Sequence, residues 1–181
     1  MMPLVILSGC LTRNRDNFMA TVSLVVMAWI YSVPPYRLKE RPPLDSLANG
    51  LGYFLFPLMM GYSLKLDPQE MPPRYYLLAL CVAGVHALAT AADIDADRAA
   101  GHKTLAVMFG RRTAAAFACV AFLLTFVYAG FSSAAVQWYL VTSAVATFAA
   151  TAVPRDRVVA AACAIVFAGF LAAAVAHLLL F

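Results

Sequence analysis

Three aspartates at alternating positions, Asp93, Asp95 and Asp97, lie in the segment ATAADIDADRAAGHKTL, residues 89–105. They directly follow an apolar run, where an uncompensated carboxylate is costly. On a helix, His86, Thr90, Asp93 and Asp97 would share one narrow face, because their spacings are four, three and four residues. Asp95 would point to the far side, toward water or a basic loop residue.

The two carboxylates on this face need compensation. Asp93 and Asp97 stand one helical turn apart at the end of an apolar helix, so they repel each other and resist desolvation. A divalent cation or a basic partner would relieve both costs. The alternative is a solvated helix end capped by acids, but the continuation of the face by His86 and Thr90 favours a binding site.

Residues after the aspartates add hydrogen-bond donors. Gly101 can end the helix, and donors for anionic oxygens follow from Arg98, Lys103, Thr104 and Arg111. Carboxylates and basic residues without a thiolate or a histidine pair favour a hard ion such as Mg²⁺, shared with a phosphate-type substrate. The combination indicates diphosphate chemistry at a membrane surface.

A second polar patch occupies residues 31–50, YSVPPYRLKERPPLDSLANG. Its four prolines prevent a helix through the loop and stiffen it. Tyr31 ends one apolar run, and Asp45 and Asn49 lie one turn apart at the start of the next, with Arg37 and Lys39 between them. A basic loop is common on any membrane protein, but polar groups that enter a membrane span mark a functional site.

The composition of the chain predicts that membrane-spanning helices carry these two polar patches. The chain has 181 residues, of which 64% are hydrophobic and 12% are charged, too apolar for a soluble domain of this size. Apolar runs of roughly membrane-spanning length, about 17–25 residues, cover residues 18–33, 44–64, 75–92, 113–130, 134–153 and 158–181. We therefore expect a single domain that forms an all-α, polytopic transmembrane helix bundle. The lipid bilayer is an expected partner, and no nucleic-acid partner is expected.

Basic residues alternate between the loops. Nine of the thirteen lie in three loops that would share one side: Arg37, Lys39, Arg41, Arg98, Lys103, Arg111, Arg112, Arg155 and Arg157. The opposite loops hold Arg13, Arg15, Lys65 and Arg74. The positive-inside rule then places the aspartate cluster on the cytoplasmic side of the cytoplasmic (inner) membrane.

The motifs YSVPPYRLKERPPLD and ADIDADRAAGHKTLAVMFG, with the alternation of spans, resemble the UbiA superfamily of intramembrane prenyltransferases. The forms DIDADRAAG and PPLDSLANG are most similar to its lycopene elongase branch. The resemblance implies a nine-helix bundle around a lipid-open cavity, in which two aspartate motifs hold Mg²⁺ that binds a prenyl diphosphate. Here Asp93 and Asp97 would form the second motif.

The resemblance also implies roles for other residues. Lys103 would contact the diphosphate, and Tyr31 with Arg37 or Lys39 would match the family's tyrosine and basic residue. Tyr31 would join Asp93 and Asp97 as a catalytic residue by stabilising an allylic cation with its aromatic face. The expected site has three further parts: Lys103, Arg37, Lys39 and Arg98 for the diphosphate, Asn49, Asp45, His86 and Thr90 for the acceptor, and Asp93 and Asp97 for the metal.

The first aspartate motif of the family, of the N-D-x-x-D type, is missing from residues 1–181. The chain therefore resembles the carboxyl-terminal six to seven helices of the family fold, with residues 1–11 as the remnant of a further helix. Asp45 is the one plausible substitute ligand for the missing side. We expect weak or no prenyl transfer from this chain alone, and restoration when an amino-terminal half with the first motif is supplied.

The resemblance favours a carotenoid acceptor, with an aromatic or chlorin acceptor as the alternative. A small transporter with a His86–Asp93–Asp97 relay is a further alternative, but acids would then recur near mid-membrane, and here they stand at span ends or in loops. A membrane scaffold without catalytic activity is the third alternative function. His86 has a second reading as a plain hydrogen bond to a neighbouring helix.

Overall fold

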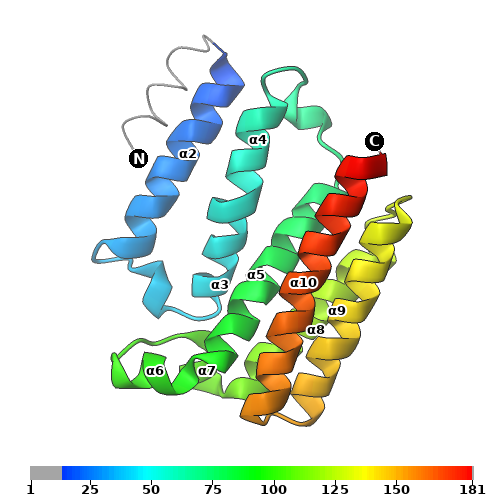
Figure 1. Cartoon of the computed structure of the whole chain (residues 1–181). Coiled ribbons are helices and arrows are strands. Elements are labelled where there is room, and N and C mark those ends of the chain that lie inside the picture. Colours follow the sequence, from blue (N-terminus) through cyan, green and yellow to red (C-terminus); the bar gives the residue numbers. More distant parts are fainter. Residues whose placement is uncertain (1–13, 181) are drawn as a thin grey trace.

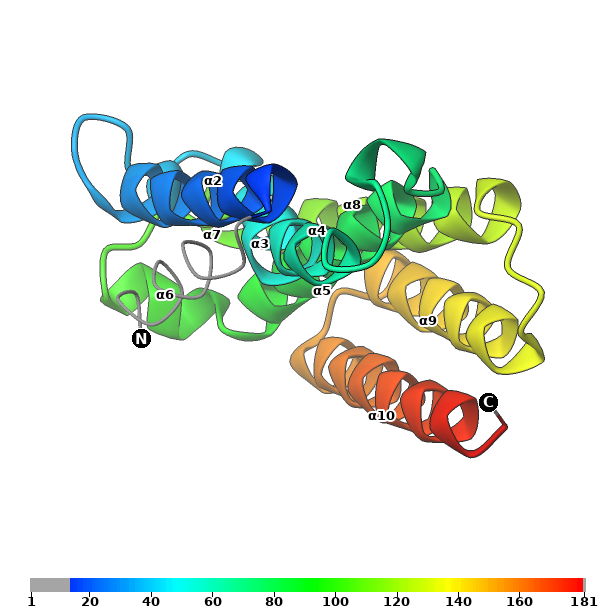
Figure 2. The ribbon, with the colours of Figure 1, turned by 90° about the horizontal axis from the view of Figure 1, so that it is seen from above.

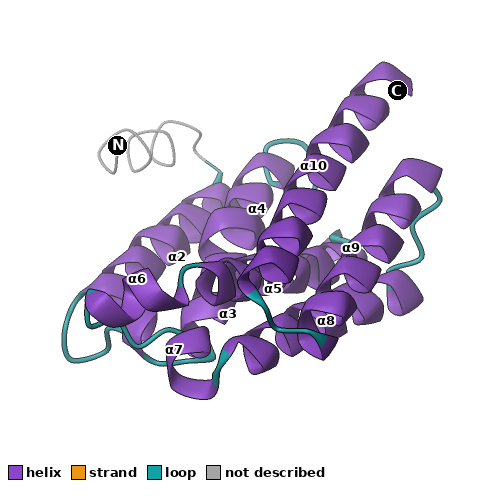
Figure 3. Ribbon diagram, turned by 60° about the horizontal axis from the view of Figure 1, so that its bottom comes forward, coloured by secondary structure: helices purple, strands orange, loops and turns teal. Residues whose placement is uncertain are grey.

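The computed structural model describes residues 14–180, with side chains for residues 14–176. The expected helix remnant in residues 1–11 lies outside this part. Helices and short turns make up the described part, and it contains no strand (Figure 3). The predicted all-α class is confirmed.

Helices form in all six of the expected apolar ranges. They are α2 (Arg15–Ser32), α3 (Leu44–Gly50) continued by a π-helical turn (Leu51–Leu55) and α4 (Phe56–Tyr62), α5 (Arg74–Ala92), α8 (Arg111–Tyr128), α9 (Ala134–Ala152) and α10 (Asp156–Leu180). The short helices α6 (Ile94–Ala99) and α7 (Leu105–Phe109) join α5 to α8, and two 3-10 turns cover Leu38–Glu40 and Pro68–Glu70.

Three of these helices are long and apolar enough to cross a membrane by length and composition. They are α5, α8 and the stretch Asp156–Ala176 of α10, with mean hydropathies of 1.7, 1.3 and 2.6. A polytopic helical membrane protein is therefore confirmed. Membrane crossing by the other three expected spans stays a prediction.

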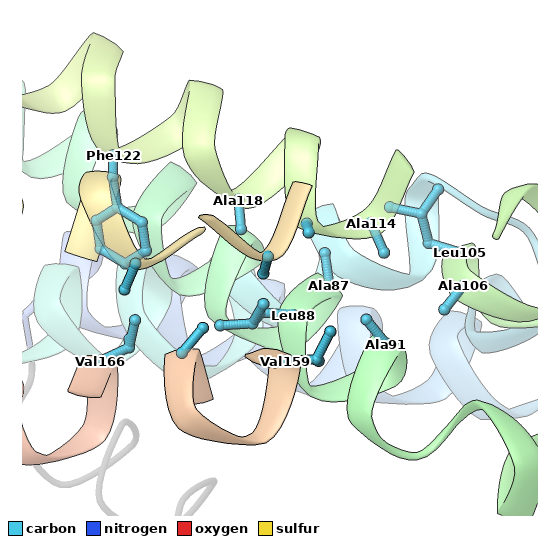
Figure 4. Close-up of a cluster of buried hydrophobic side chains, with 14 of the residues drawn as sticks. Ala87, Leu88, Ala91, Leu105, Ala106, Ala114, Ala118, Phe122, Val159 and Val166 are labelled. Atoms are coloured by element: carbon cyan, nitrogen blue, oxygen red, sulfur yellow. The ribbon is translucent and has the colours of Figure 1, made fainter. Parts of the chain in front are cut away.

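Small residues allow α5, α8, α9 and α10 to pack closely. Ala87, Ala114 and Ala118 are fully buried, and a Cβ atom on Gly84 would stand only 3.1 Å from the Ala118 Cα atom. Larger side chains such as Phe122 fill the spaces between these contacts (Figure 4). Close approach through small residues drives helix association where lipid replaces water.

Polar side chains join the amino-terminal helices. The Asn14 side chain accepts hydrogen bonds from the backbone N–H groups of Asp16 and Asn17 and so caps α2. It also donates to the Ser63 carbonyl at 2.6 Å, while the Asn17 amide donates to the Met60 carbonyl at 2.7 Å. These bonds fix α2 beside α4. Viewed from above, α5 lies centrally, between α2 and α4 on one side and α9 and α10 on the other (Figure 2).

The three basic loops lie at one end of the bundle. The turn between α2 and α3, the α6–α7 segment and the start of α10 stand together at the bottom of Figure 1. An ion pair of 2.6 Å from the Arg111 Nη1 atom to Asp156 links two of these loops. The alternation of loops between the two ends agrees with the sequence pattern.

The contact between α3 and α5 depends on Gly50. A Cβ atom at this position would collide with the Ala79 carbonyl group. We expect Gly50→Ala to lower the stability by about 1–3 kcal/mol through overpacking, measured as a lower apparent melting temperature in detergent. Gly61→Ala is the matched control, because a Cβ atom there meets nothing within 4 Å. An unchanged melting temperature for Gly50→Ala would contradict the close contact.

Candidate active site

The polypeptide bends at Asp93, which separates α5 from α6. Asp93 has φ −96° and ψ 11°, outside the helical region, so the expectation of one continuous helix through Asp97 is wrong. Backbone bonds nevertheless cross the bend, from the Asp93 N–H to Ala89 and from the Asp97 N–H to Asp93. Because this spacing persists, the four residues expected on one face still meet at one cavity.

That cavity has a volume of about 330 Å³ and is lined by Tyr31, Lys39, Glu40, His86, Ala89, Thr90, Asp93, Asp97, His102 and Thr104. It lies where α2, the Leu38–Glu40 turn, α5, α6 and the loop before α7 converge, at the end of the bundle that carries the basic loops. We call it the polar cavity. Its lining combines carboxylates, a cation, hydroxyls and imidazoles.

The two central carboxylates differ in their surroundings. Asp97 accepts a hydrogen bond of 3.1 Å from the Thr104 hydroxyl, and its other oxygen lies 3.5 Å from the His102 Nδ1 atom. Asp93 is exposed, and its side chain makes no capping bond to α6. The protein therefore holds Asp97 in place and leaves the Asp93 carboxylate directed to a ligand or to water.

Asp95 lies outside the polar cavity, as its position in the sequence predicts. Its carboxylate pairs with Arg111 at 3.0 Å and with Arg98 at 3.4 Å. Arg111 also donates to the Ala91 carbonyl at 3.1 Å. Arg111 therefore braces the end of α5, and the structure does not bring Arg98 to the cavity.

The other basic residues of the expected diphosphate site take different positions. Lys39 lines the polar cavity, beside Glu40. Arg37 pairs with Glu40 at 2.6 Å, outside the lining. Lys103 is exposed on the loop between His102 and Thr104, both of which line the cavity. Lys39 is thus the cation placed in the lining, with Lys103 on the adjoining loop.

The acceptor-pocket residues separate into two groups. His86 and Thr90 line the polar cavity. Asp45 is fully buried behind it, and its Oδ2 atom accepts from the Leu105 N–H at 3.1 Å. Asn49 donates to the Tyr31 hydroxyl at 3.1 Å. Asp45 is therefore not placed to bind an acceptor or a metal in this lining.

An apolar cavity adjoins the polar one at Tyr31. It has a volume of about 310 Å³ and lies between α2 and α3, lined by Leu24, Met27, Ala28, Tyr31, Ser32, Ala48, Asn49, Gly52 and Tyr53. Tyr31 belongs to both linings, so the charged cavity and the apolar cavity are neighbours at this side chain.

Some contributors were missed from the sequence. Glu40 and His102 line the polar cavity, and Ser46 shares a hydrogen bond of 3.2 Å with the His86 Nδ1 atom. The hydrogen bond from His86 to a neighbouring helix is thus present, while its role toward an acceptor stays a prediction. In the sequence, Gly101 before His102 could have indicated a turn at this position. In the structure, Gly101 has a left-handed φ of 74°, and the chain turns back so that the His102 N–H donates to the Asp97 carbonyl.

The donor set fits Mg²⁺ in the form that this ion takes with phosphates. Mg²⁺ is usually held by one or two carboxylates together with substrate oxygens and water. Asp93 and Asp97 provide two carboxylates in one lining, and residues 14–176 contain no group of three acidic, histidine or cysteine side chains that would form a complete protein cage. A metal here would need oxygen ligands from a substrate or from water.

The fold and the site define a polytopic helical membrane protein with a carboxylate-lined cavity at one end of its bundle. The model of the UbiA prenyltransferase family matches residues 1–173. The chain belongs to this family.

Relatives with assigned activities match part of the chain. It is similar to the lycopene elongase/hydratases of Haloarcula japonica and Halobacterium salinarum, with 33% identity over 114 residues and 36% over 102 residues. It is also 33% identical over 109 residues to the bacteriochlorophyll synthase 33 kDa chain of Rhodobacter capsulatus. These matches cover 59%, 55% and 57% of this chain but only 38%, 36% and 36% of the relatives. No solved structure matches the chain.

The geometry separates Asp93 and Asp97 from Asp95. We expect Asp93→Asn and Asp97→Asn each to weaken Mg²⁺-dependent binding of inorganic pyrophosphate by at least about 10-fold, because each removes a charged ligand. Asp95→Asn is the matched control and should change binding little, since its exposed ion pairs contribute weakly. Titration calorimetry on protein in lipid nanodiscs measures all three. Equal losses would contradict the assignment.

Proposed function

We propose that the chain takes part in transfer of a prenyl group from an allylic prenyl diphosphate to a hydrophobic acceptor within the membrane. The observation that carries this proposal is that Tyr31 lines both a carboxylate-lined cavity and an apolar cavity. A prenyl diphosphate has a charged head and a hydrocarbon chain, and the two cavities match these parts. Membership of the UbiA prenyltransferase family supports the same reaction.

The roles of the residues follow from their positions. Asp93 and Asp97 would hold Mg²⁺, which supplies neutralisation of the diphosphate charge. Lys39 faces the same space and stabilises negative charge that grows on the leaving oxygen. The carbon–oxygen bond breaks with its electron pair on the diphosphate, and the Tyr31 ring faces the allylic cation that remains. Electrons of an acceptor double bond form the new carbon–carbon bond, and a proton then leaves the acceptor.

The side of the polar cavity formed by α5 faces the reacting carbons in this arrangement. His86 and Thr90 lie there, about one turn apart on the helix. We propose that they shape the acceptor position and that His86 takes up the released proton. Its ring is held by Ser46, so the imidazole has a fixed orientation. Arg37 and Lys103 would attract the anionic substrate from the surface rather than contact it in the lining.

For the acceptor we propose a carotenoid, with an aromatic or chlorin ring as the alternative. Both kinds of acceptor are suggested by relatives, since two are lycopene elongase/hydratases and one is a bacteriochlorophyll synthase chain. A five-carbon allylic diphosphate is the proposed donor.

Pigment analysis tests the proposed reaction. The chain is expressed in lycopene-producing cells, alone and together with a polypeptide that supplies the N-D-x-x-D motif. We expect lycopene extended by a prenyl group when both are present, and loss of this product with Asp97→Asn, because the diphosphate would no longer be held. Unchanged lycopene together with a prenylated ring compound would support the alternative acceptor, and no prenylated product in any arm would contradict the proposal.

We also propose that the polar cavity faces the cytoplasm. The three basic loops stand at its end of the bundle, and the positive-inside bias places such loops in the cytoplasm. A soluble diphosphate made in the cytoplasm would then reach the cavity without crossing the bilayer.

Cysteine labelling tests this orientation. We expect Lys103→Cys to react with an impermeant maleimide only after the cells are opened, and Lys65→Cys to react in intact cells. Both residues are exposed, and the α6–α7 and α4–α5 connections that carry them stand at opposite ends of the bundle (Figure 1). The chain without either substitution measures labelling of the native cysteines. Labelling of Lys103→Cys from outside intact cells would overturn the orientation.

A further inference from the structure

The Asp45–Asn49 segment of α3 buries three polar side chains behind the polar cavity. Asp45 and Ser46 are fully buried and Asn49 is 7% exposed. Burial of polar groups in an apolar bundle is costly unless each finds a partner. Three such groups lie within five residues, so the hydrogen-bond partners of these side chains are needed to offset the cost of burial.

Each of the three side chains is bonded to a different element of the site. Asp45 accepts from the Leu105 N–H of α7 at 3.1 Å, Ser46 shares a hydrogen bond of 3.2 Å with His86 of α5, and Asn49 donates to the Tyr31 hydroxyl of α2 at 3.1 Å. His86 and Tyr31 line the polar cavity directly, and Leu105 follows Thr104, which also lines it. One short segment of α3 therefore contacts two residues of the cavity lining and the residue that follows a third.

The Asp45–Asn49 segment is itself held firmly. Gly50 lets α3 approach the Ala79 carbonyl of α5 without room for a Cβ atom. The Asn49 amide also donates to the Asp45 carbonyl at 2.8 Å, which ties the two ends of the segment together. A rigid support transmits a fixed geometry to the groups that it contacts.

Two hydrogen bonds connect Asp45 to Asp97, the proposed metal ligand, through Leu105 and Thr104. Its Oδ2 atom fixes the Leu105 N–H, and the preceding residue, Thr104, donates its hydroxyl to the Asp97 Oδ2 atom at 3.1 Å. We propose that the Asp45–Asn49 segment of α3 is a positioning element for the site, and that Asp45 is a positioning residue that orients the Asp97 carboxylate through Leu105 and Thr104. This inference rests on the proposed binding of Mg²⁺ and diphosphate at Asp97.

The role of Asp45 depends on an acceptor oxygen, not on binding a cation. The Oδ1 atom is buried without a hydrogen-bond partner, while Oδ2 makes the bond to Leu105. Asparagine has nearly the same shape and offers one carbonyl oxygen that can accept the same bond. Alanine cannot accept it. The two substitutions therefore separate positioning from metal ligation.

The test compares Asp45→Asn with Asp45→Ala in the full chain in nanodiscs, with inorganic pyrophosphate and MgCl₂ as the probe. We expect Asp45→Ala to raise the Kd by about 10-fold and Asp45→Asn to stay within about threefold of the wild type. Hydrogen exchange gives a second readout. Amides 104–109 should exchange faster in Asp45→Ala and at the wild-type rate in Asp45→Asn, while α8 and α9 stay unchanged in both.

A double-substitution cycle links Asp45 to Thr104. Thr104→Val removes the bond to Asp97, so Asp45→Ala should add little to its effect on pyrophosphate binding if both act through the same contact. Additive effects would overturn the proposal, as would an equal loss with Asn and Ala at position 45, which would indicate a charge requirement. If the wild-type chain binds no pyrophosphate, the proposed binding of diphosphate at Asp93 and Asp97 fails for this chain alone. That outcome concerns diphosphate binding by this chain alone, and the pigment analysis with the N-D-x-x-D polypeptide still tests the reaction. Exchange at amides 104–109 then decides the positioning role by itself, and wild-type rates in Asp45→Ala would overturn it.

Discussion

A carboxylate that is withdrawn from water at the end of an apolar bundle needs hydrogen-bond donors from the protein, and this requirement organises the site. Thr104 donates to Asp97, and the Leu105 N–H donates to Asp45. Both donors come from the start of α7, which is anchored in the core by the buried side chain of Leu105. The carboxylate without such a donor is Asp93, at the bend between α5 and α6. The protein thus fixes one carboxylate and leaves its neighbour open to a ligand.

The close packing of the helices allows this polar end to exist. Alanines and Gly84 bring α5, α8, α9 and α10 into contact, so α5 is packed on several sides in the middle of the bundle. The same helix carries His86 and Thr90 toward the polar cavity. On its other side, the close approach at Gly50 fixes α3, and α3 in turn contacts Tyr31. The boundary between the polar and apolar cavities therefore depends on backbone contacts deep in the bundle.

Much of the fold follows from the sequence, because apolar run length and loop charge depend on local composition. All six apolar runs are helical, and the spacing of His86, Thr90, Asp93 and Asp97 correctly predicted that they meet. The bend at Asp93 was not predicted, since nothing in DIDAD breaks a helix by itself. The burial of Asp45 and its bond to Leu105 join residues 60 positions apart, so only tertiary packing could reveal them. Basic residues were the least predictable, because Arg37 and Arg98 have acidic neighbours that compete with a substrate.

The proposed site at Asp93 and Asp97 is tested most directly by the distance between the bound metal and the diphosphate. Mn²⁺ can replace Mg²⁺ at sites of oxygen ligands and reports its neighbours by electron–nuclear double resonance. With a non-reactive prenyl thiolodiphosphate bound to the chain in nanodiscs, a strong ³¹P coupling to Mn²⁺ is predicted for the wild type. The coupling should vanish when Asp93 and Asp97 are both changed to Asn. A ³¹P coupling that persists in the double variant would show that the diphosphate and its metal bind elsewhere.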